Sequence, residues 1–407
     1  MKKVFLFSFL IIAIYLTSCQ KNDTSNVTTS IIPTQQRPLN QVPQNDTDTS
    51  QNIFTISAIT NPEPGIICVS PEWGTTHTNG MIMILNERGH VLKKKTVPTT
   101  ATNFRRWDVN GKVRYSYEQY DLNGYIMSGI GYWPGYEIIT DSNLNEIDRV
   151  KLQSYGTVTY TQDGIDGHDF VYIDDGHYII ESYYQKTVTN VPASIDTIAN
   201  TKVVADIIQE TMNGVVIWQW DGTDYPEFYS ESLENNQFNN PNTVYDYLHL
   251  NSMFIDPRDN NLICSFRNLD EVVKLERGTG RIIWRLGGNS TDFGLNADQI
   301  FLRQHHVTLT DNNQTLLLFD DGLTIDRNFS RVLEFNLDES THTVIGFKSF
   351  DIPEPFTQFE GSVQKRGNTY FIGGGTANYV AEINYETGEK LLELKSSSAR
   401  YYRAYKY

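Results

Sequence analysis

Three histidines lie in polar strings whose residue types could support a reaction: His168, His249 and His305. The densest string is Asp246-Tyr247-Leu248-His249-Leu250-Asn251, and Arg267 ends the next apolar run. In an extended segment side chains alternate, so His249 and Asn251 would face one side and Asp246 the other. An imidazole, an amide and a guanidinium together supply donors for an oxyanion such as sulfate or phosphate. The sequence therefore predicts an oxyanion site that leaves Asp246 out.

The third histidine belongs to the doublet His305-His306, which follows Gln304. Strand alternation directs the two imidazoles to opposite faces, so we expect only one of them to reach a common site. The Gln304-His305 pair favours His305 over His306. The remaining histidines, His77, His90, His177 and His342, have no polar context that supports a chemical role.

The elements that must position these side chains are short strands. Runs rich in Val, Ile, Tyr and Phe follow Asn-Gly and Asp-Gly turns, such as Asn110-Gly111 before 112–117 and Asp175-Gly176 before 177–184. A weak repeat joins two such runs through a turn at 272–284, 332–345 and 380–392. We interpret each unit as the two outer strands of a blade.

About six units of this size fit the chain, so the predicted fold is all-β, a six-bladed β-propeller. A pair of β-sandwiches is the alternative. In a propeller the inner strands surround a central channel, and His168, His249 and His305 each lie just before or within an expected inner strand of a different repeat. We therefore expect the three imidazoles to converge.

The N-terminus has the order of a secretory signal: Lys2 and Lys3, an apolar run over 4–16, then Leu16-Thr17-Ser18-Cys19. The last string resembles a bacterial lipobox, which implies cleavage before Cys19 and lipid on its thiol; an ordinary signal peptide with an incidental cysteine is the alternative. We predict a signal peptide at 1–18, a lipidated, disordered tether at 19–50 and a propeller domain at 51–407. The expected location is the cell envelope, at the outer membrane, periplasmic or surface-exposed.

The composition of the chain limits the classes of binding partner. Thirty-three basic and 49 acidic residues give a net charge of −16, and no basic cluster offsets it, so nucleic acid is not an expected partner. Cys68 and Cys264 remain after processing and show no metal-ligand spacing. Two buried free thiols are favoured over a disulfide between them. No metal or cofactor is expected, and the sequence leaves the oligomeric state open.

The combined motifs resemble the bacterial arylsulfate sulfotransferases. The strings that carry the resemblance are 246–252, Ser265-Phe266-Arg267-Asn268, 280–288 and Gln304-His305, with flanking matches at Pro64-Gly65, 361–364 and Tyr402-Arg403-Ala404. The resemblance implies a six-bladed propeller that moves a sulfuryl group from an aryl sulfate to a phenol through a sulfohistidine, without a nucleotide donor. It implies His305 as nucleophile, His249, Asn251 and Arg267 as sulfate-holding and acid–base groups, and His168 as a further active-site histidine.

Aryl substrates stack on aromatic faces, and Trp133, Tyr245, Tyr247 and Phe359 are candidates for the pocket. Two other functions compete with transfer. One is a non-catalytic surface propeller that binds a glycan or a protein. The other is a metal-dependent lyase or hydrolase that uses His168, Asp169 and His249, which the absence of a His-x-His or His-Glu-x-x-His string disfavours.

Overall fold

The computed structural model describes residues 54–407 except 74–76, 125–126, 128, 161–163, 235, 311 and 398. These residues belong to one compact unit, Asn52–Tyr407. The predicted signal peptide, the tether and Cys19 lie outside the described residues. Six antiparallel sheets make up the unit, which confirms the six-bladed propeller and excludes a pair of sandwiches.

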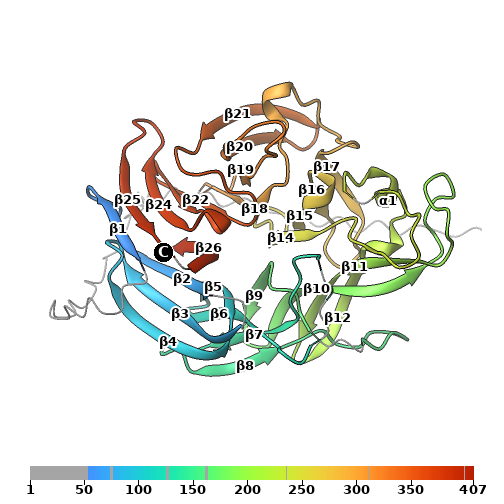
Figure 1. Cartoon of the computed structure of the whole chain (residues 1–407), viewed down its shortest axis with the longest axis horizontal. Coiled ribbons are helices and arrows are strands. Elements are labelled where there is room, and N and C mark those ends of the chain that lie inside the picture. The colour runs from blue at the N-terminus through green and yellow to red at the C-terminus, as the bar shows by residue number, and fades with distance from the viewer. Residues whose placement is uncertain are drawn as a thin grey trace, which may run out of the picture. The chain divides into compact units, whose positions relative to one another are not determined.

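The sheets surround a common centre, with β26, β5, β9, β14, β18 and β22 innermost (Figure 1). From the centre outward, the first three blades are β26 (Ala399–Lys406), β2 (Ile66–Trp73), β3 (Thr78–Asn86) and β4 (Val91–Thr99); β5 (Ala101–Val109), β6 (Lys112–Tyr120), β7 (Gly135–Thr140) and β8 (Glu146–Val150); and β9 (Phe170–Asp174), β10 (His177–Val188), β11 (Thr201–Met212) and β12 (Val215–Asp221), with β13 (Val244–Tyr245) parallel to β11.

The other three blades follow the same order. They are β14 (Leu250–Ile255), β15 (Leu262–Phe266), β16 (Glu271–Leu275) and β17 (Ile282–Gly287); β18 (His305–Leu309), β19 (Thr315–Asp320), β20 (Arg331–Asp338) and β21 (Thr343–Asp351); and β22 (Ser362–Arg366), β23 (Thr369–Gly373), β24 (Tyr379–Asn384), β25 (Lys390–Lys395) and β1 (Thr55–Ile59). The three repeats seen in the sequence are β16–β17, β20–β21 and β24–β25, so their interpretation as outer blade strands is confirmed.

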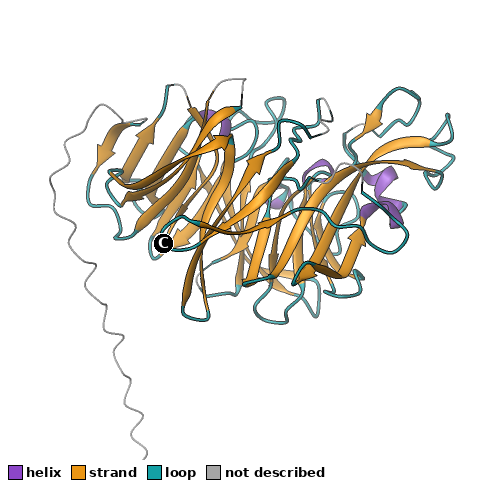
Figure 2. Ribbon diagram, turned by 90° about the horizontal axis from the view of Figure 1, so that it is seen from below, coloured by secondary structure: helices purple, strands orange, loops and turns teal. Residues whose placement is uncertain are grey.

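Helices are few and short among the described residues: α1 (Glu227–Glu231), η2 (Gly222–Asp224), η3 (Arg267–Leu269), η4 (Ala297–Gln299) and η5 (Gly375–Ala377). Seen from the side, the strands cross the thickness of the ring and loops form both of its faces (Figure 2). None of these helices has the length and apolar character needed to cross a membrane.

Both ends of the described chain close the ring. The C-terminal strand β26 is the inner strand of the blade that continues with β2, pairing Ile67 with Lys406. The N-terminal strand β1 adds a fifth strand outside β25, where Thr55 pairs with Lys395. The ring is therefore closed twice, at its inner edge by β26 and at its outer edge by β1.

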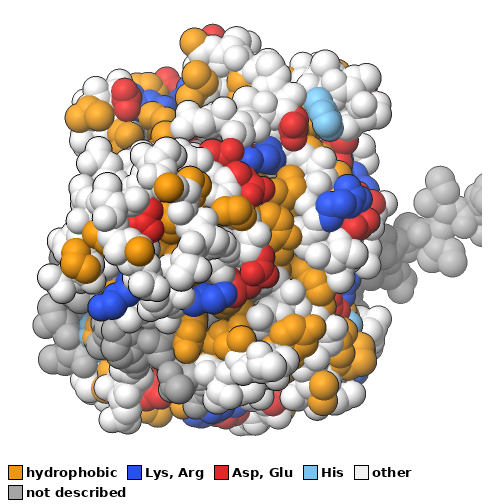
Figure 3. All heavy atoms as spheres, turned by 90° about the vertical axis from the view of Figure 1, so that its right-hand side faces the viewer, with side chains coloured by type: hydrophobic (Ala, Val, Ile, Leu, Met, Phe, Trp, Pro, Cys, Tyr) orange, Lys and Arg blue, Asp and Glu red, His pale blue; other side chains and the backbone are white. Residues whose placement is uncertain are grey.

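The core lies between neighbouring blades, where apolar faces of the sheets meet. For example, Trp284 and Leu286 of β17 pack with Leu318 of β19 and Phe335 of β20 in one buried cluster. Cys68 and Cys264 are buried free thiols in two different clusters, as the sequence analysis favoured. The outer side of the ring seen in Figure 3 intersperses charges of both signs and has no continuous basic patch.

Candidate active site

Three neighbouring blades bring the predicted histidines to one cavity of about 680 Å³. His168 lies two residues before β9, His249 immediately precedes β14 and His305 is the first residue of β18. All three side chains line the cavity together with Arg267. The expectation that the inner strands would make these residues converge is confirmed.

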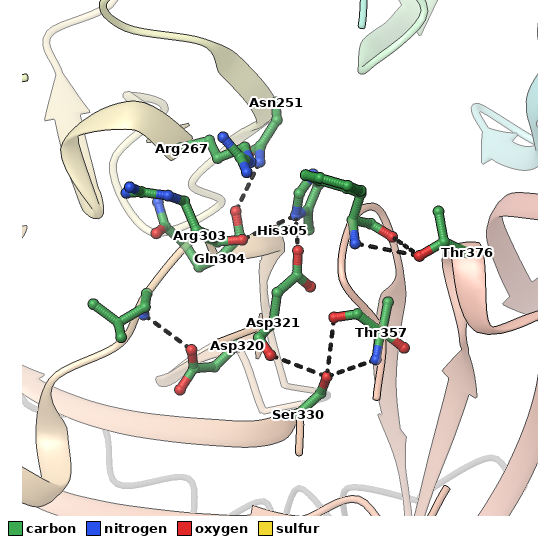
Figure 4. A network of polar contacts seen from close by, with 12 residues as sticks. Asn251, Arg267, Arg303, Gln304, His305, Asp320, Asp321, Ser330, Thr357 and Thr376 are labelled. Atoms are coloured by element: carbon green, nitrogen blue, oxygen red, sulfur yellow. Dashed lines mark hydrogen bonds and ion pairs between the residues drawn. The ribbon is translucent and has the colours of Figure 1, made fainter. Parts of the chain in front are cut away.

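His305 is held so that its Nε2 is unprotonated. Its Nδ1 lies 2.7 Å from Asp321 Oδ2 and 3.1 Å from the carbonyl oxygen of Arg303 (Figure 4). Because a carbonyl oxygen can only accept, Nδ1 must carry the ring proton, and Nε2 keeps its lone pair. Burial, helped by the nearby Arg267, lowers the pKa of His305 well below its ordinary value. The imidazole is therefore neutral and keeps a lone pair on Nε2.

His306 does not reach the cavity, as alternation along the doublet predicts. Its Nδ1 accepts a hydrogen bond from the Val363 amide at 3.2 Å, and its ring packs against Tyr405 with centroids 5.5 Å apart. The side chain is buried between β22 and β26 instead. Only His305 of the doublet lines the cavity.

The structure corrects the expectation for Asp246. This carboxylate lines the cavity, and its Oδ2 lies 2.6 Å from Nδ1 of His249. The expectation failed because His249 adopts a left-handed backbone with φ 60°, so regular alternation begins only at Leu250. Burial lowers the pKa of His249, and the charge of Asp246 opposes that effect.

His168 has the same kind of partner. Its Nδ1 contacts Asp166 Oδ2 closely, and its ring meets that of His249 edge-on with centroids 5.0 Å apart. The Tyr402 ring covers another side of His168 at 5.4 Å. Each of the three cavity histidines thus has its Nδ1 beside an aspartate.

Arg267 and Asn251 lie on the side of His305 opposite Asp321 (Figure 4). Arg267 lines the cavity, donates through Nη1 to Asn268 Oδ1 at 2.8 Å, and stacks on Phe359 at 5.4 Å. Its second bond, to Glu234 Oε2, is 3.3 Å long and partly exposed. Much of the guanidinium therefore remains available to an anion in the cavity.

Asn251 is placed differently from the expectation that it would share a face with His249. Its Nδ2 donates to the carbonyl oxygen of Gln304 at 2.7 Å, and the residue is not among those that line the cavity. The carbonyl oxygen of Asn251 accepts from Arg403 Nη2 at 2.6 Å. The first bond joins β14 to the residue that precedes His305, and the second joins β14 to β26.

The sequence model of the arylsulfotransferase (ASST) family matches residues 40–406, which is most of the chain. The chain belongs to the arylsulfotransferase family. Membership implies a sulfotransferase enzyme that acts on aryl sulfates and phenols. Among curated proteins, none matches the sequence.

Comparison of this family member with solved structures gives matches of low similarity. A periplasmic gluconolactonase of Pseudomonas aeruginosa is 10% identical, covers 83% of this chain and 98% of its own, and has a TM-score of 0.46. A protein of unknown function from Bacteroides caccae is 12% identical over 84% of this chain and 98% of its own, with a TM-score of 0.42. At such low similarity neither structure bears on the activity of this arylsulfotransferase.

Among the described residues, one buried group could hold a metal ion, and two of its members, Asp166 and His168, line the cavity. Potential ligand atoms of Asp166, His168 and Glu181 all lie within 4.8 Å of one another. The alternative set considered from sequence, His168 with Asp169 and His249, is not assembled in this way. Asp169 is instead bound by Arg105 at 2.6 Å and by Arg403 at 3.1 Å.

Sequence reasoning missed the aspartates beside the histidines in this arylsulfotransferase. A local signal existed for Asp166, two residues before His168, whereas Asp321 reaches His305 only because β18 pairs with β19. Of the aromatic candidates, Trp133 and Phe359 line the cavity, while Tyr247 is buried against Tyr229 at 4.4 Å. Tyr245 lines a separate small pocket.

Proposed function

We propose that the enzyme moves a sulfuryl group from an aryl sulfate to a phenolic acceptor through a sulfohistidine at His305, without a nucleotide donor. The observation that carries the proposal is the pair of contacts at Nδ1 of His305, which favour a lone pair on Nε2, in a cavity that Arg267 and two further histidines also line. A covalent carrier divides one difficult transfer into two easier ones.

In the first half-reaction the Nε2 lone pair of His305 attacks sulfur, and the bond between sulfur and the aryl oxygen breaks with its electron pair on oxygen. The phenolate takes a proton from the imidazolium of His249 or His168. The His305 ring becomes cationic when it is sulfurylated. Asp321, 2.7 Å from Nδ1, is placed to balance that charge.

The sulfuryl oxygens need positive charge while both bonds to sulfur are weak. Arg267 supplies it, because a guanidinium can donate to two oxygens at once. Asn251 acts indirectly in this proposal: its bond to the Gln304 carbonyl fixes the backbone from which His305 projects. We therefore propose a positioning role for Asn251 in place of direct contact with sulfate, because the residue does not line the cavity.

In the second half-reaction an acceptor phenol gives its proton to the imidazole that lost one. Its oxygen attacks sulfur, and the bond between sulfur and Nε2 breaks and returns the lone pair to His305. The enzyme ends in its starting protonation state. Because the donor is itself an aryl sulfate, no nucleotide enters the cycle.

The test follows the release of 4-nitrophenol from 4-nitrophenyl sulfate with and without phenol, and with EDTA. Release that depends on phenol and survives EDTA supports the proposal. Mass spectrometry of protein quenched before phenol is added should find a sulfuryl adduct on the peptide containing His305. Release that needs a metal and ignores phenol, or an adduct on another residue, contradicts it; no release from several aryl sulfates would favour the binding propeller.

We further propose that the enzyme is a lipoprotein of the cell envelope, anchored at the outer membrane through Cys19. The support is the order of basic, apolar and small residues before Cys19 and the polar composition up to residue 50. Labelling cells with a fatty-acid analogue tests it, with Cys19→Ala as the variant and wild type as the control. Equal labelling of both proteins contradicts the anchor.

A further inference from the structure

The cavity wall is richer in acid than sulfate chemistry requires. Two guanidinium groups, of Arg267 and Arg400, are accompanied by six carboxylates: Glu72, Glu118, Asp166, Glu234, Asp246 and Glu360. At the histidine end, each lining acid has a basic partner: Asp166 contacts His168, Asp246 contacts His249 and Glu234 contacts Arg267. At the other end, which we call the acidic end, lie Arg400, Glu72, Glu118 and Glu360. The two ends of the cavity therefore differ in how completely their acids are paired.

At the acidic end, Glu72 and Glu360 share the guanidinium of Arg400, and Glu118 has no cationic partner among the residues that the structure describes. Nε of Arg400 lies 3.0 Å from Glu72 Oε2, and its Nη1 lies 3.5 Å from Glu360 Oε1. Glu118 accepts only from the Thr102 hydroxyl, at 3.0 Å. Glu360 Oε2 and Glu118 Oε1 have no protein partner. Two negative charges are left over when all three acids are ionised.

The carboxyl group of Glu118 occupies a space that two neighbouring glycines leave open. The side chain is 2% exposed and lines the cavity. A Cβ added at Gly167 would lie 1.8 Å from Glu118 Oε2, and one at Gly135 would lie 2.4 Å from Oε1. Only glycine at both positions leaves room for this carboxyl, which burial without a charged partner makes costly. A cation in the cavity would remove that cost.

Aromatic faces border the same end. The rings of Tyr120 and Trp133 stack with centroids 5.4 Å apart and an interplanar angle of 13°, and His77 lies 4.1 Å from Trp133. Burial, together with the charges of Glu72 and Glu118, raises the pKa of Tyr120 well above its ordinary value, which places this ring among the acids. Carboxylates beside aromatic faces suit an organic ammonium ion.

The acidic end is close to the reacting end. Glu118 adjoins Gly167, the residue before His168, and Glu360 follows Phe359, whose ring stacks on Arg267 at 5.4 Å. A cavity of about 680 Å³ holds one aromatic ring with a short side chain. A ring whose oxygen lies at the histidines would then extend its substituent towards Glu118.

We propose that the acidic end is an ammonium subsite and that the acceptor is a phenol carrying a protonated amine on a short chain. This inference rests on the proposed function, because it assigns the acceptor of that same transfer. The ammonium group pairs with Glu118 and packs on Tyr120 and Trp133. An anionic phenol meets like charge in the same place and is rejected.

The experiment compares three acceptors of similar size with 4-nitrophenyl sulfate as donor: 4-(2-aminoethyl)phenol, 4-ethylphenol and 4-hydroxyphenylacetate. We expect kcat/KM for the amine to exceed that for 4-ethylphenol about tenfold or more, because one charge-assisted hydrogen bond between the ammonium group and Glu118 contributes an effect of that size. The carboxylate should be the poorest acceptor. The ratio of amine to ethylphenol is the readout, because it cancels changes in the transfer step itself.

Glu118→Gln should reduce that ratio about tenfold, since the amide keeps the shape and removes the charge. Glu137→Gln is the matched control, because Glu137 pairs with Glu118 across β6 and β7 and is also 2% exposed, but does not line the cavity. The control should keep the wild-type ratio. Equal loss in both variants would mean that general negative charge, and not the subsite, sets the preference.

The outcomes separate the two proposals. Transfer to 4-ethylphenol that matches or exceeds transfer to the amine overturns the subsite and leaves the proposed function intact. If no phenol accepts, the proposed function fails, and calorimetry with 4-(2-aminoethyl)phenol alone decides the subsite. Binding that Glu118→Gln abolishes and Glu137→Gln keeps supports it; the absence of binding to wild type overturns it.

Discussion

Two buried aspartates near the middle of the ring, Asp169 and Asp321, differ in how many hydrogen bonds their carboxylate oxygens accept. Asp169 accepts from Arg105 at 2.6 Å and from the Phe170 amide at 2.9 Å through Oδ1, and from the Met253 amide at 3.0 Å and Arg403 at 3.1 Å through Oδ2. By contrast, within the described part of the chain the Asp321 carboxylate contacts only Nδ1 of His305, at 2.7 Å.

The pKa values follow this difference. Burial alone would raise the pKa of Asp169, but Arg403 and Arg105 bring it below its ordinary value. Burial raises the pKa of Asp321 well above its ordinary value. A buried carboxylate that accepts all of its hydrogen bonds stabilises the fold. A buried carboxylate with unfilled acceptor positions destabilises the resting enzyme, but it stabilises the state in which the neighbouring histidine is positively charged. Asp169 therefore has a structural role, and Asp321 is the acid to which our proposal gives a part in the reaction.

The largest expected effect is on the nucleophile. His305→Ala should lower transfer by roughly 10⁴-fold or more, because it removes the carrier itself. His306→Ala, which removes the buried neighbour packed on Tyr405, should keep most of the activity. Steady-state assays with 4-nitrophenyl sulfate and phenol measure both. Loss of transfer in His306→Ala together with retention in His305→Ala would reverse the assignment.

The second prediction concerns stability. Asp169→Asn should lower the free energy of unfolding by about 3–5 kcal/mol, because Arg105 and Arg403 lose their shared counter-charge. Urea denaturation followed by fluorescence measures it. Asp321→Asn serves as the control and should change stability by about 1 kcal/mol or less, since it replaces an incompletely bonded acid. Equal destabilisation by the two variants would remove the distinction between the networks.

The third prediction tests Asp321 in catalysis. Asp321→Asn should lower kcat about 10²-fold or more, because the amide cannot balance the cationic sulfohistidine. The sulfohistidine should also accumulate less in protein quenched without phenol, as mass spectrometry can quantify. Unchanged accumulation with a normal kcat would show that Asp321 does not act through His305.

The smallest expected effect is on pH dependence. If His249 and not His168 gives the proton to a poor leaving group, the rate should fall as pH rises through the pKa of His249, which burial lowers. The charge of Asp246 opposes that lowering, so Asp246→Asn should move the fall to lower pH. His305 stays neutral throughout, because its pKa lies well below the ordinary value. Profiles with phenyl sulfate measure the shift, and identical profiles would exclude His249 as the acid.

The fold was predictable because its signals are local and repeated. Alternating runs joined by Gly-rich turns, such as 272–284 and 380–392, specify pairs of outer strands wherever they occur. The place of His168, His249 and His305 at inner strands followed from the same repeat. What the sequence could not show is the local backbone at those positions.

The site was only partly predictable for that reason. Asp246 was left out because the left-handed φ of His249 is invisible in a period-two pattern. Asp321 and Glu118 belong to no motif. Asp321 follows β19, which pairs with the strand that begins at His305, whereas Glu118 lies in β6, whose neighbours β5 and β7 carry none of the predicted site residues. Contacts between distant segments need the register of every blade, which composition does not determine.

The double closure of the ring has a mechanical consequence. A force applied through the chain that precedes residue 54 reaches β1 first, and β1 lies on the outer edge of its blade. Peeling β1 from β25 leaves the pairing of β26 with β2 intact, so the inner edge of the ring still holds. Arg403 belongs to β26 and bonds to the backbone of Asn251. A pull on the N-terminus would thus be absorbed by a strand that the reacting groups do not touch.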